Sequence, residues 1–426
     1  MRKIFFITFV FLFAQIFHVA PVQAKHSADF RNNYTLTGVV ILSRHNIRSP
    51  MSDKNSALAK ITPHDWFKWT SAPSELSLRG GELETIMGQY FRKWLVDEKL
   101  ITENYLPADG EIRFYANSLQ RTIATAQFFS SGLFPVANVR IEHKFDVGKA
   151  DPVFNPQITF ADDEYRASVN KYMRAMFADK TPKNGYRLIE KVLDFKDSAF
   201  AKKEELTHFR DDKLEFTFEV DKELAAHETL KLASQASDAL TLQYYEAETP
   251  LDAAFGHEIS FSDWQEISSV KDFYGEVLYS APAVAVNVAH PLLQIMHDEL
   301  LTDRKFTFLC GHDSNIVSVL SALEVEEYSL PQTIECKTPI GGKLVFEKWR
   351  GTDGVDYVET ELIYQSTEQL RNKITLTLDN PPMIFPIRFK DIPQNADGLY
   401  RLEDLQKRFQ KTFDAYNELP TDSRVA

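Results

Sequence analysis

Two short, almost purely apolar runs constrain the fold of this chain more than any other feature. Val39-Val40-Ile41-Leu42 and Phe306-Thr307-Phe308-Leu309-Cys310 lie far apart in the sequence, and neither alternates with charged residues. Strands of this kind are covered by helices on both faces. His45 follows the first run and His312 follows the second. Because ligands bind at the carboxyl ends of strands in open α/β sheets, the sequence predicts that the two histidines share one pocket.

The rest of the chain alternates β-prone runs with helical patterns, which predicts the α/β class. We expect five strands, over residues 38–43, 111–116, 305–310, 343–349 and 357–364. A helix is predicted over 81–98, where apolar residues recur at three- and four-residue spacing. That spacing is typical of a face that packs in the core, not of a cofactor site. A second helix is expected to begin just after Ser118.

The strand signals fade between about residues 150 and 280. Helical patterns replace them, over residues 162–178, 184–194, 222–247 and 262–271. A chain of 426 residues exceeds what one hydrophobic core usually serves. We therefore expect an α/β core made of residues 25–150 and 281–426, with a smaller, mainly helical domain inserted at 151–280.

Residues 1–24 have the pattern of a secretory signal peptide. Arg2 and Lys3 precede an apolar stretch that ends in Val22-Gln23-Ala24, a small-x-small cleavage site. The alternative is an uncleaved membrane anchor, which the short and interrupted apolar stretch disfavours. We expect export to a bacterial periplasm, a mature chain that begins at Lys25, and no membrane attachment after cleavage.

The net charge argues against nucleic acid as a partner. It moves from −13 to −15 on cleavage, because the leader carries two positive charges. A chain this acidic repels phosphodiester backbones, so any bound phosphate has to be held by a local arginine cluster.

The chain has only two cysteines, Cys310 and Cys336, which excludes a disulfide framework. Cys310 ends an apolar run and is expected to be a small buried residue. We therefore expect the two cysteines to be unbonded.

The turn after the first apolar run reads Arg44-His45-Asn46-Ile47-Arg48-Ser49-Pro50. Guanidinium groups match phosphoryl oxygens in pairs. A neutral imidazole between them can attack phosphorus if a hydrogen bond holds its other ring nitrogen. The alternative is that these are solvated surface charges, and the heptapeptide alone leaves both interpretations open.

Two further places where a predicted strand is followed by a helix favour the interpretation as a phosphate site. Arg121 is expected in the first turn of the helix after Ser118, where backbone N–H groups also attract anions. Asp313 follows His312, and a carboxyl group kept protonated beside phosphate can supply the proton that a leaving oxygen needs. Arg121 alone is weak evidence for a phosphate site. It counts because the other two strand ends supply two more arginines, two histidines and a carboxylate.

Arg44-His45-x-x-Arg48-x-Pro50 and His312-Asp313 resemble the two signatures of the histidine acid phosphatases, the two-domain branch of the histidine phosphatase superfamily. Asn46 stands where most of that family has glycine. Together with four further stretches it resembles the members that hydrolyse glucose 1-phosphate: residues 116–122, 311–315, 338–343 and 365–372. The resemblance runs from about residue 38 to residue 372.

The resemblance implies a central mixed sheet flanked by helices, as in phosphoglycerate mutases, with the helical domain inserted. It implies that His45 is the nucleophile that becomes phosphohistidine and that Asp313 protonates the leaving oxygen. Phosphoryl oxygens would be held by Arg44, Arg48, Arg121 and His312. No cofactor and no metal ion would be required.

Two further residues are candidates for substrate binding. The amide of Asn46 could touch the substrate, or the residue could serve only the conformation of the turn. Glu246 ends a stretch that also resembles the glucose 1-phosphate hydrolases, and it is expected either to narrow the pocket or to be a solvated residue at a helix end. The other nine of the 11 histidines show no His-x-x-x-His spacing, which predicts no metal site.

The sequence therefore predicts an acid phosphomonoesterase that hydrolyses a small sugar phosphate such as glucose 1-phosphate through a phosphohistidine. One alternative is a phytase-like phosphatase for inositol polyphosphates, which needs a more basic pocket than this acidic chain suggests. Another is a phosphate-binding protein without catalysis, which the presence of both a nucleophile and a proton donor disfavours. A monomer or a homodimer is expected.

Overall fold

The computed structural model describes residues 25–51, 56–209 and 214–419, and a mixed sheet lies at its centre. The order of its strands is β10-β8-β7-β1-β6-β2-β3, with β9 beside β8. β1 (Tyr34–Arg44), β6 (Phe306–Gly311), β2 (Ile112–Ala116) and β3 (Ile141–Glu142) run parallel to one another. The antiparallel strands are β7 (Lys343–Gly351), β8 (Asp356–Tyr364), β9 (Met383–Pro386) and β10 (Tyr400–Arg401). The α/β class, the mixed sheet and the five expected strands are confirmed.

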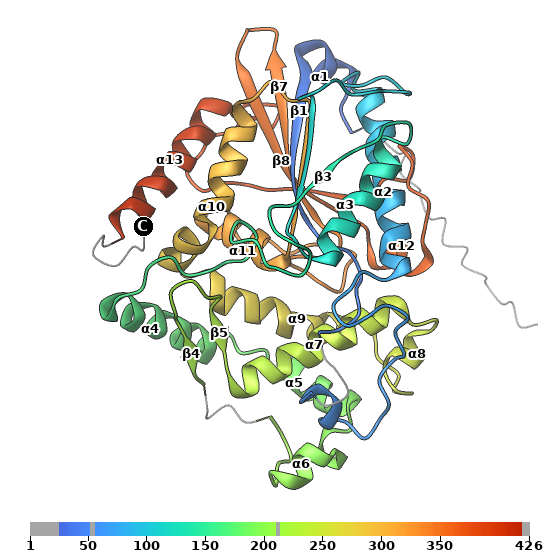
Figure 1. Cartoon of the computed structure of the whole chain (residues 1–426), viewed down its shortest axis with the longest axis vertical. Helices are drawn as coiled ribbons and strands as arrows, with labels where there is room; N and C mark the ends of the chain where they lie inside the picture. The colour runs from blue at the N-terminus through green and yellow to red at the C-terminus, as the bar shows by residue number, and fades with distance from the viewer. Residues whose placement is uncertain (1–24, 52–55, 210–213, 420–426) are drawn as a thin grey trace, which may run out of the picture.

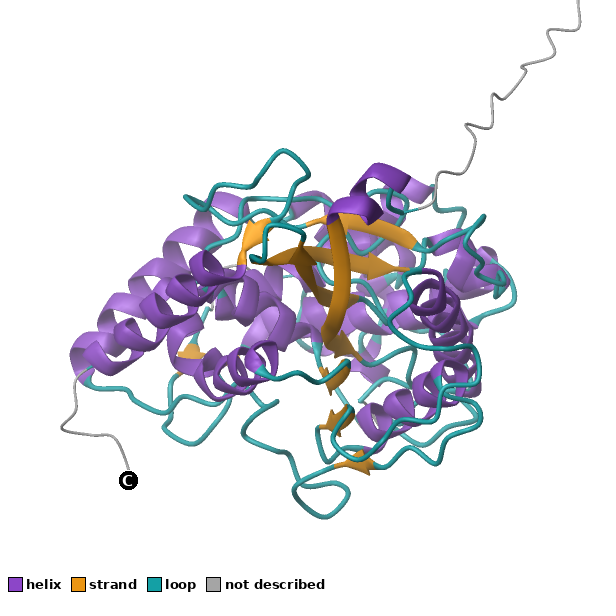
Figure 2. Ribbon diagram, turned by 90° about the horizontal axis from the view of Figure 1, so that it is seen from above, coloured by secondary structure: helices purple, strands orange, loops and turns teal. Residues whose placement is uncertain are grey.

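Helices cover both faces of the sheet, as the apolar runs predict (Figures 1 and 2). One face is covered by α2 (Leu78–Asp97) and α3 (Gln120–Leu133), the other by α10 (Pro282–Leu301), α11 (Asp313–Ala322) and α13 (Leu402–Glu418). Side chains alternate along β1: Val39 and Ile41 pack with α2 and α3, whereas Val40 and Leu42 pack with α10 and α11.

The segment of the chain that separates the two parts of the α/β core, residues 151–280, is mainly helical, as expected. It contains α4 (Asp163–Lys180), α5 (Lys183–Val192), α7 (Glu228–Glu246) and α9 (Phe261–Tyr279), which lie below the sheet in Figure 1. α9 is longer than predicted. The segment expected to begin a helix at residue 222 instead contributes a short strand, β5 (Ala225–Ala226), paired with β4 (Phe216–Thr217).

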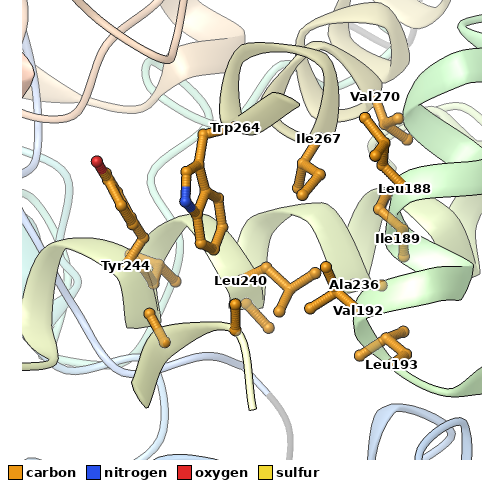
Figure 3. Packing of buried hydrophobic residues seen from close by; sticks show 14 of the residues in the cluster. Leu188, Ile189, Val192, Leu193, Ala236, Leu240, Tyr244, Trp264, Ile267 and Val270 are labelled. Atoms are coloured by element: carbon orange, nitrogen blue, oxygen red, sulfur yellow. The ribbon is translucent and has the colours of Figure 1, made fainter. Parts of the chain in front are cut away.

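The helices of this region share an apolar cluster that continues into the α/β part through Ile47, Leu83 and Ile340. Figure 3 shows Trp264 and Ile267 of α9 facing Leu240 of α7, with Leu188 and Ile189 of α5 beside them. These side chains are buried, so hydrophobic burial stabilises the region and also holds it against the α/β part. The domain boundaries at residues 150 and 281 stay a prediction.

Short elements connect these layers. They are α1 (Ala28–Asn33), η1 (Leu58–Lys60), η2 (Phe195–Asp197), α6 (Ala199–Lys203), α8 (Pro250–Ala253) and α12 (Thr367–Asn372). Cys310 is buried in β6 and is not bonded to Cys336, as expected. No helix formed by the described residues is long and apolar enough to cross a membrane. The predicted signal peptide, residues 1–24, lies outside the described residues.

Candidate active site

The pairing of β1 with β6 brings the two histidines together. Arg44 at the end of β1 lies opposite Gly311 at the end of β6, and the His45 N–H donates to the Gly311 carbonyl at 3.1 Å. The rings of His45 and His312 follow with centroids 5.4 Å apart, at an angle of 71°. The two histidines therefore share one pocket, as the sequence predicts.

His45 has the environment of a nucleophile. Its Nδ1 lies 2.9 Å from the backbone carbonyl oxygen of Asn46, which assigns the ring proton to Nδ1 and leaves the lone pair on Nε2. Burial lowers the pKa of His45 well below its usual range, and the charges of Arg121 and Arg48 lower it further. The imidazole is therefore neutral and can form a bond to phosphorus through Nε2.

His312 is held by an asparagine that the sequence analysis did not single out. The Asn117 Oδ1 accepts from the backbone N–H of Asp151 at 2.9 Å, which fixes the orientation of the amide. The Asn117 Nδ2 then donates to the Nε2 of His312 at 2.7 Å. Burial and the charge of Arg121 lower the pKa of His312 well below its usual range, so this ring is neutral too.

Three arginines surround the histidines, and two of them line the cavity directly. Arg48 and Arg121 are lining residues, whereas Arg44 lies beneath the floor with an exposed fraction of 1%. The Arg44 Nη1 donates to Glu335 at 2.6 Å, and the Arg48 Nη2 donates to Asp238 at 2.9 Å. Burial and the charge of Arg48 lower the pKa of Arg121 to about 10.

The Nε atoms of these three arginines have no hydrogen-bond partner among the described residues. Buried donors without a partner are rare in folded proteins, and each one calls for an explanation. An anion with several oxygens would satisfy them, because guanidinium groups bind phosphoryl oxygens with charge-assisted hydrogen bonds. The arrangement is therefore chemically suited to a phosphoryl group next to His45.

Asp313 is the first residue of α11 and is ionised by its surroundings. Its Oδ2 contacts the Nζ of Lys271 and lies 3.8 Å from the Nη2 of Arg44. Burial alone would raise the pKa of Asp313, but these two cations hold it well below its usual range. The two cations thus favour the ionised carboxylate, and protonation of this carboxyl group beside a phosphate stays a prediction.

The side chain of Asn46 points away from the cavity. Its Nδ2 donates to Glu84 Oε1 at 2.7 Å, and Glu84 forms a buried ion pair with Lys343 at 3.0 Å. Asn46 does not have a positive φ angle, so no left-handed conformation explains the residue. The amide supports the nucleophile turn from behind, which favours the conformational role over contact with substrate.

Glu246, the last residue of α7, does not line the cavity. Its Oε2 instead accepts a hydrogen bond from Ser77 Oγ at 2.9 Å, and Ser77 caps the N-terminus of α2. Burial raises the pKa of Glu246. The structure thus gives this residue a place between two helices and no part in narrowing the pocket.

The cavity in front of His45 has a volume of about 1090 Å³ and walls from several segments. Its floor is basic around His45, where Arg48 and Arg121 lie, whereas its outer wall carries exposed carboxylates and apolar side chains: Glu204, Glu228, Phe195, Phe200 and Leu232. Asp238 of α7 and Lys271 of α9 form an ion pair, with Asp238 Oδ1 3.3 Å from Lys271 Nζ, and this pair connects the floor of the cavity to its outer wall. No local sequence pattern could have paired these two residues, because they lie on different helices.

Comparison with known proteins agrees with this geometry. The family model described as histidine phosphatase superfamily (branch 2) matches residues 35–363. A glucose-1-phosphatase of Providencia rettgeri is 38% identical over 93% of this chain and 96% of its own length. A phytase of Escherichia coli is 29% identical over 82% of this chain and 84% of its own length. The structure of a Hafnia alvei phytase superposes with a TM-score of 0.82 at 24% identity, covering 91% of this chain and 99% of that one.

The low pKa of His45 should depend on Arg121. We expect Arg121→Gln to raise the pKa values of His45 and His312, because it removes the largest single charge that opposes their protonation. At low pH, activity is lost because the nucleophile becomes protonated. A higher pKa of His45 should therefore move the acid limb of the kcat/KM profile to higher pH.

The measurement is an NMR titration of ring-labelled histidine in the parent chain and the variant. Arg113→Gln is the matched control, because Arg113 lies on β2, pairs with Glu142 and Glu299, and does not line the cavity. Unchanged midpoints for His45 and His312 in Arg121→Gln would contradict the assignment.

Proposed function

Because this chain belongs to branch 2 of the histidine phosphatase superfamily, we propose that it is an acid phosphomonoesterase that hydrolyses glucose 1-phosphate or a similar sugar phosphate. One observation carries the proposal: a neutral His45 with its ring proton on Nδ1 lies among three arginines whose Nε donors have no partner within the described part of the chain. The identity to glucose-1-phosphatases supports the choice of substrate class.

In the first step, the Nε2 of His45 forms a bond to phosphorus while the bond from phosphorus to the sugar oxygen breaks. The imidazole then carries a positive charge, and its Nδ1–H keeps its hydrogen bond to the Asn46 carbonyl, which stabilises that charge. Arg48, Arg121 and the buried Arg44 neutralise the negative charge on the equatorial oxygens of a loose transition state.

The leaving sugar oxygen takes a proton from Asp313. The carboxylate is ionised by Lys271 and Arg44, so it has to acquire this proton as substrate binds. A phosphate dianion beside Asp313 opposes the field of both cations and raises the pKa of the carboxyl group. At mildly acidic pH the proton comes from solvent or from the substrate monoanion.

In the second step, water attacks phosphorus and the bond from phosphorus to Nε2 breaks. Asp313, now a carboxylate again, accepts the proton of the attacking water. Inorganic phosphate leaves and His45 returns to its neutral form, so the cycle needs no metal ion.

The charges of the cavity favour a single phosphate over an inositol polyphosphate. The cations on its floor surround His45, whereas the outer wall offers exposed carboxylates and the exposed Lys231. Additional phosphates would lie against those carboxylates, where like charges repel. Sugar hydroxyl groups can instead donate hydrogen bonds to the same carboxylates.

A panel of phosphomonoesters assayed with EDTA present tests this proposal. We expect glucose 1-phosphate to be hydrolysed with a kcat/KM well above that for phytate, and EDTA to leave turnover unchanged. His45→Ala should abolish turnover, and acid quenching should trap acid-labile label on His45 of the parent chain. Faster turnover of phytate would favour the phytase-like alternative, and binding without any turnover would favour a phosphate-binding protein.

Asp313→Asn should separate substrates by their leaving groups. We expect a much larger loss of kcat for glucose 1-phosphate than for an aryl phosphate with an activated leaving group, because a good leaving group needs no proton. General acid catalysis typically contributes about 10²–10⁴-fold, so the difference should approach that range. Equal losses for both esters would exclude Asp313 as the acid.

We also propose export to the periplasm with cleavage between Ala24 and Lys25. The residues after this point belong to the fold: the Lys25 Nζ contacts Glu347 and Glu361, and the His26 ring binds Glu98 and Glu359. Cleavage two residues later would remove the Lys25 ammonium group and the His26 ring from these carboxylates. N-terminal sequencing of protein from a periplasmic fraction should begin at Lys25, and an N-terminus at Met1 would refute cleavage. The choice between monomer and homodimer stays a prediction.

A further inference from the structure

Three side chains far from the phosphate pocket converge on one point. His64 lies between η1 and α2, Asp194 between α5 and η2, and His257 between α8 and α9. One ligand atom from each lies within 4.8 Å of the other two. We propose that these residues form a zinc site that ties the segment after the nucleophile turn to the helical region. This inference does not depend on the proposed function.

The spacing of His257 and Asp194 suits a tetrahedral ion, whereas the shorter hydrogen bond of His64 to Asp194 would have to lengthen by about 0.5 Å. The Nε2 of His64 lies 2.8 Å from Asp194 Oδ2, and the Nε2 of His257 lies 3.3 Å from the same oxygen. Zinc binds imidazole nitrogen and carboxylate oxygen at about 2.0–2.2 Å, which places neighbouring ligand atoms of a tetrahedron roughly 3.3 Å apart. The three side chains are 27–37% exposed, which leaves room for water as a fourth ligand.

The surrounding structure holds the ligands in place. Asp194 has a left-handed backbone with φ 46° and lies between Leu193 and Phe195, both buried. The His64 ring stacks on Phe255 at 4.9 Å and 13°, and Phe255 also has a positive φ of 51°. A bulky residue rarely adopts this conformation, so two of the three segments store backbone strain next to a ligand.

A second group of three potential metal ligands differs from the first, because a lysine already pairs with its carboxylates. The ligand atoms of His26, Glu347 and Glu359 also lie within 4.8 Å of one another. There, however, the ammonium group of Lys25 already contacts Glu347 and lies 4.0 Å from Glu359. Among the described residues, Asp194 forms ion pairs only with His64 and His257, so no lysine or arginine takes the place of a metal ion.

The proposed ion would act on structure and not on the phosphoryl transfer. None of its three ligands lines the active-site cavity, but Phe195 and Leu58, which lie near two of them in the chain, do. Bound zinc would therefore fix one side of the cavity while the chemistry remains that of His45 and Asp313. Because the three ligands come from separate segments of the chain, the His-x-x-x-His spacing that identifies a metal site in a sequence could not reveal this one.

Zinc binding by the full mature chain, prepared without a histidine tag and stripped with EDTA, tests the proposal. We expect calorimetric titration with zinc chloride to give one ion per chain, and the midpoint of thermal unfolding to rise with zinc concentration. His257→Ala and Asp194→Asn should lose both effects. His208→Ala is the matched control and should keep both, because exposed His208 forms an ion pair with Glu190 and with no other residue in the described part of the chain.

Two results would overturn the proposal. The first is no zinc-dependent rise of the unfolding midpoint in the parent chain. The second is equal zinc binding by the parent chain and by His257→Ala, which would place the ion elsewhere. If His257→Ala does not fold, as circular dichroism would show, His64→Gln repeats the comparison, and the zinc-dependent shift of the parent chain decides by itself whether the folded chain binds the ion.

Discussion

The parallel pairing of β1 with β6 is the constraint on which the rest of the site depends. It sets Arg44 opposite Gly311, so the residues that follow, His45 and His312, leave the sheet side by side. A shift of the register by one residue would turn every side chain of β1 to the opposite face. Val39 and Val40 pack against different helices, so both faces of the strand resist such a shift. Burial of the strand therefore fixes the geometry of the catalytic pair.

The same cations have two effects on the chemistry. In the proposed reaction, Arg48 and Arg121 provide donors for a phosphoryl group, and their charge also keeps His45, the proposed nucleophile, neutral. Burying arginine is costly unless carboxylates compensate, and removing one partner of a buried pair costs about 3–5 kcal/mol. Glu335 and Asp238 supply this compensation, but each takes up Nη atoms only and leaves the Nε donors free. The carboxylates thus stabilise the arginine cluster without occupying its Nε donors.

The sequence predicted the elements that local patterns determine and missed the contacts between elements. The apolar runs identified β1 and β6, and the turns after them identified the histidines. The ionised state of Asp313 could not be predicted, because it depends on Lys271 of α9, which no spacing connects to α11. Glu246 was a candidate for the pocket from a resemblance, with a solvated helix end as the alternative, whereas its carboxylate accepts a hydrogen bond from Ser77 at the N-terminus of α2. Asn46 lies in the expected turn, but Glu84 behind the strand determines where its amide points.

Selectivity in this fold depends more on charge than on volume. A cavity of about 1090 Å³ is large enough for more than one sugar phosphate, so size alone does not exclude a larger substrate. The floor of the cavity comes from the strand ends, whereas its outer wall comes from α7, α9 and the segment after Asp194. Glu204 and Glu228 are exposed carboxylates in the lining of the cavity, and their like charge would repel the additional phosphates of a polyphosphate. Changes confined to the helical region can therefore alter which phosphate esters bind, while the nucleophile and its arginines remain unchanged.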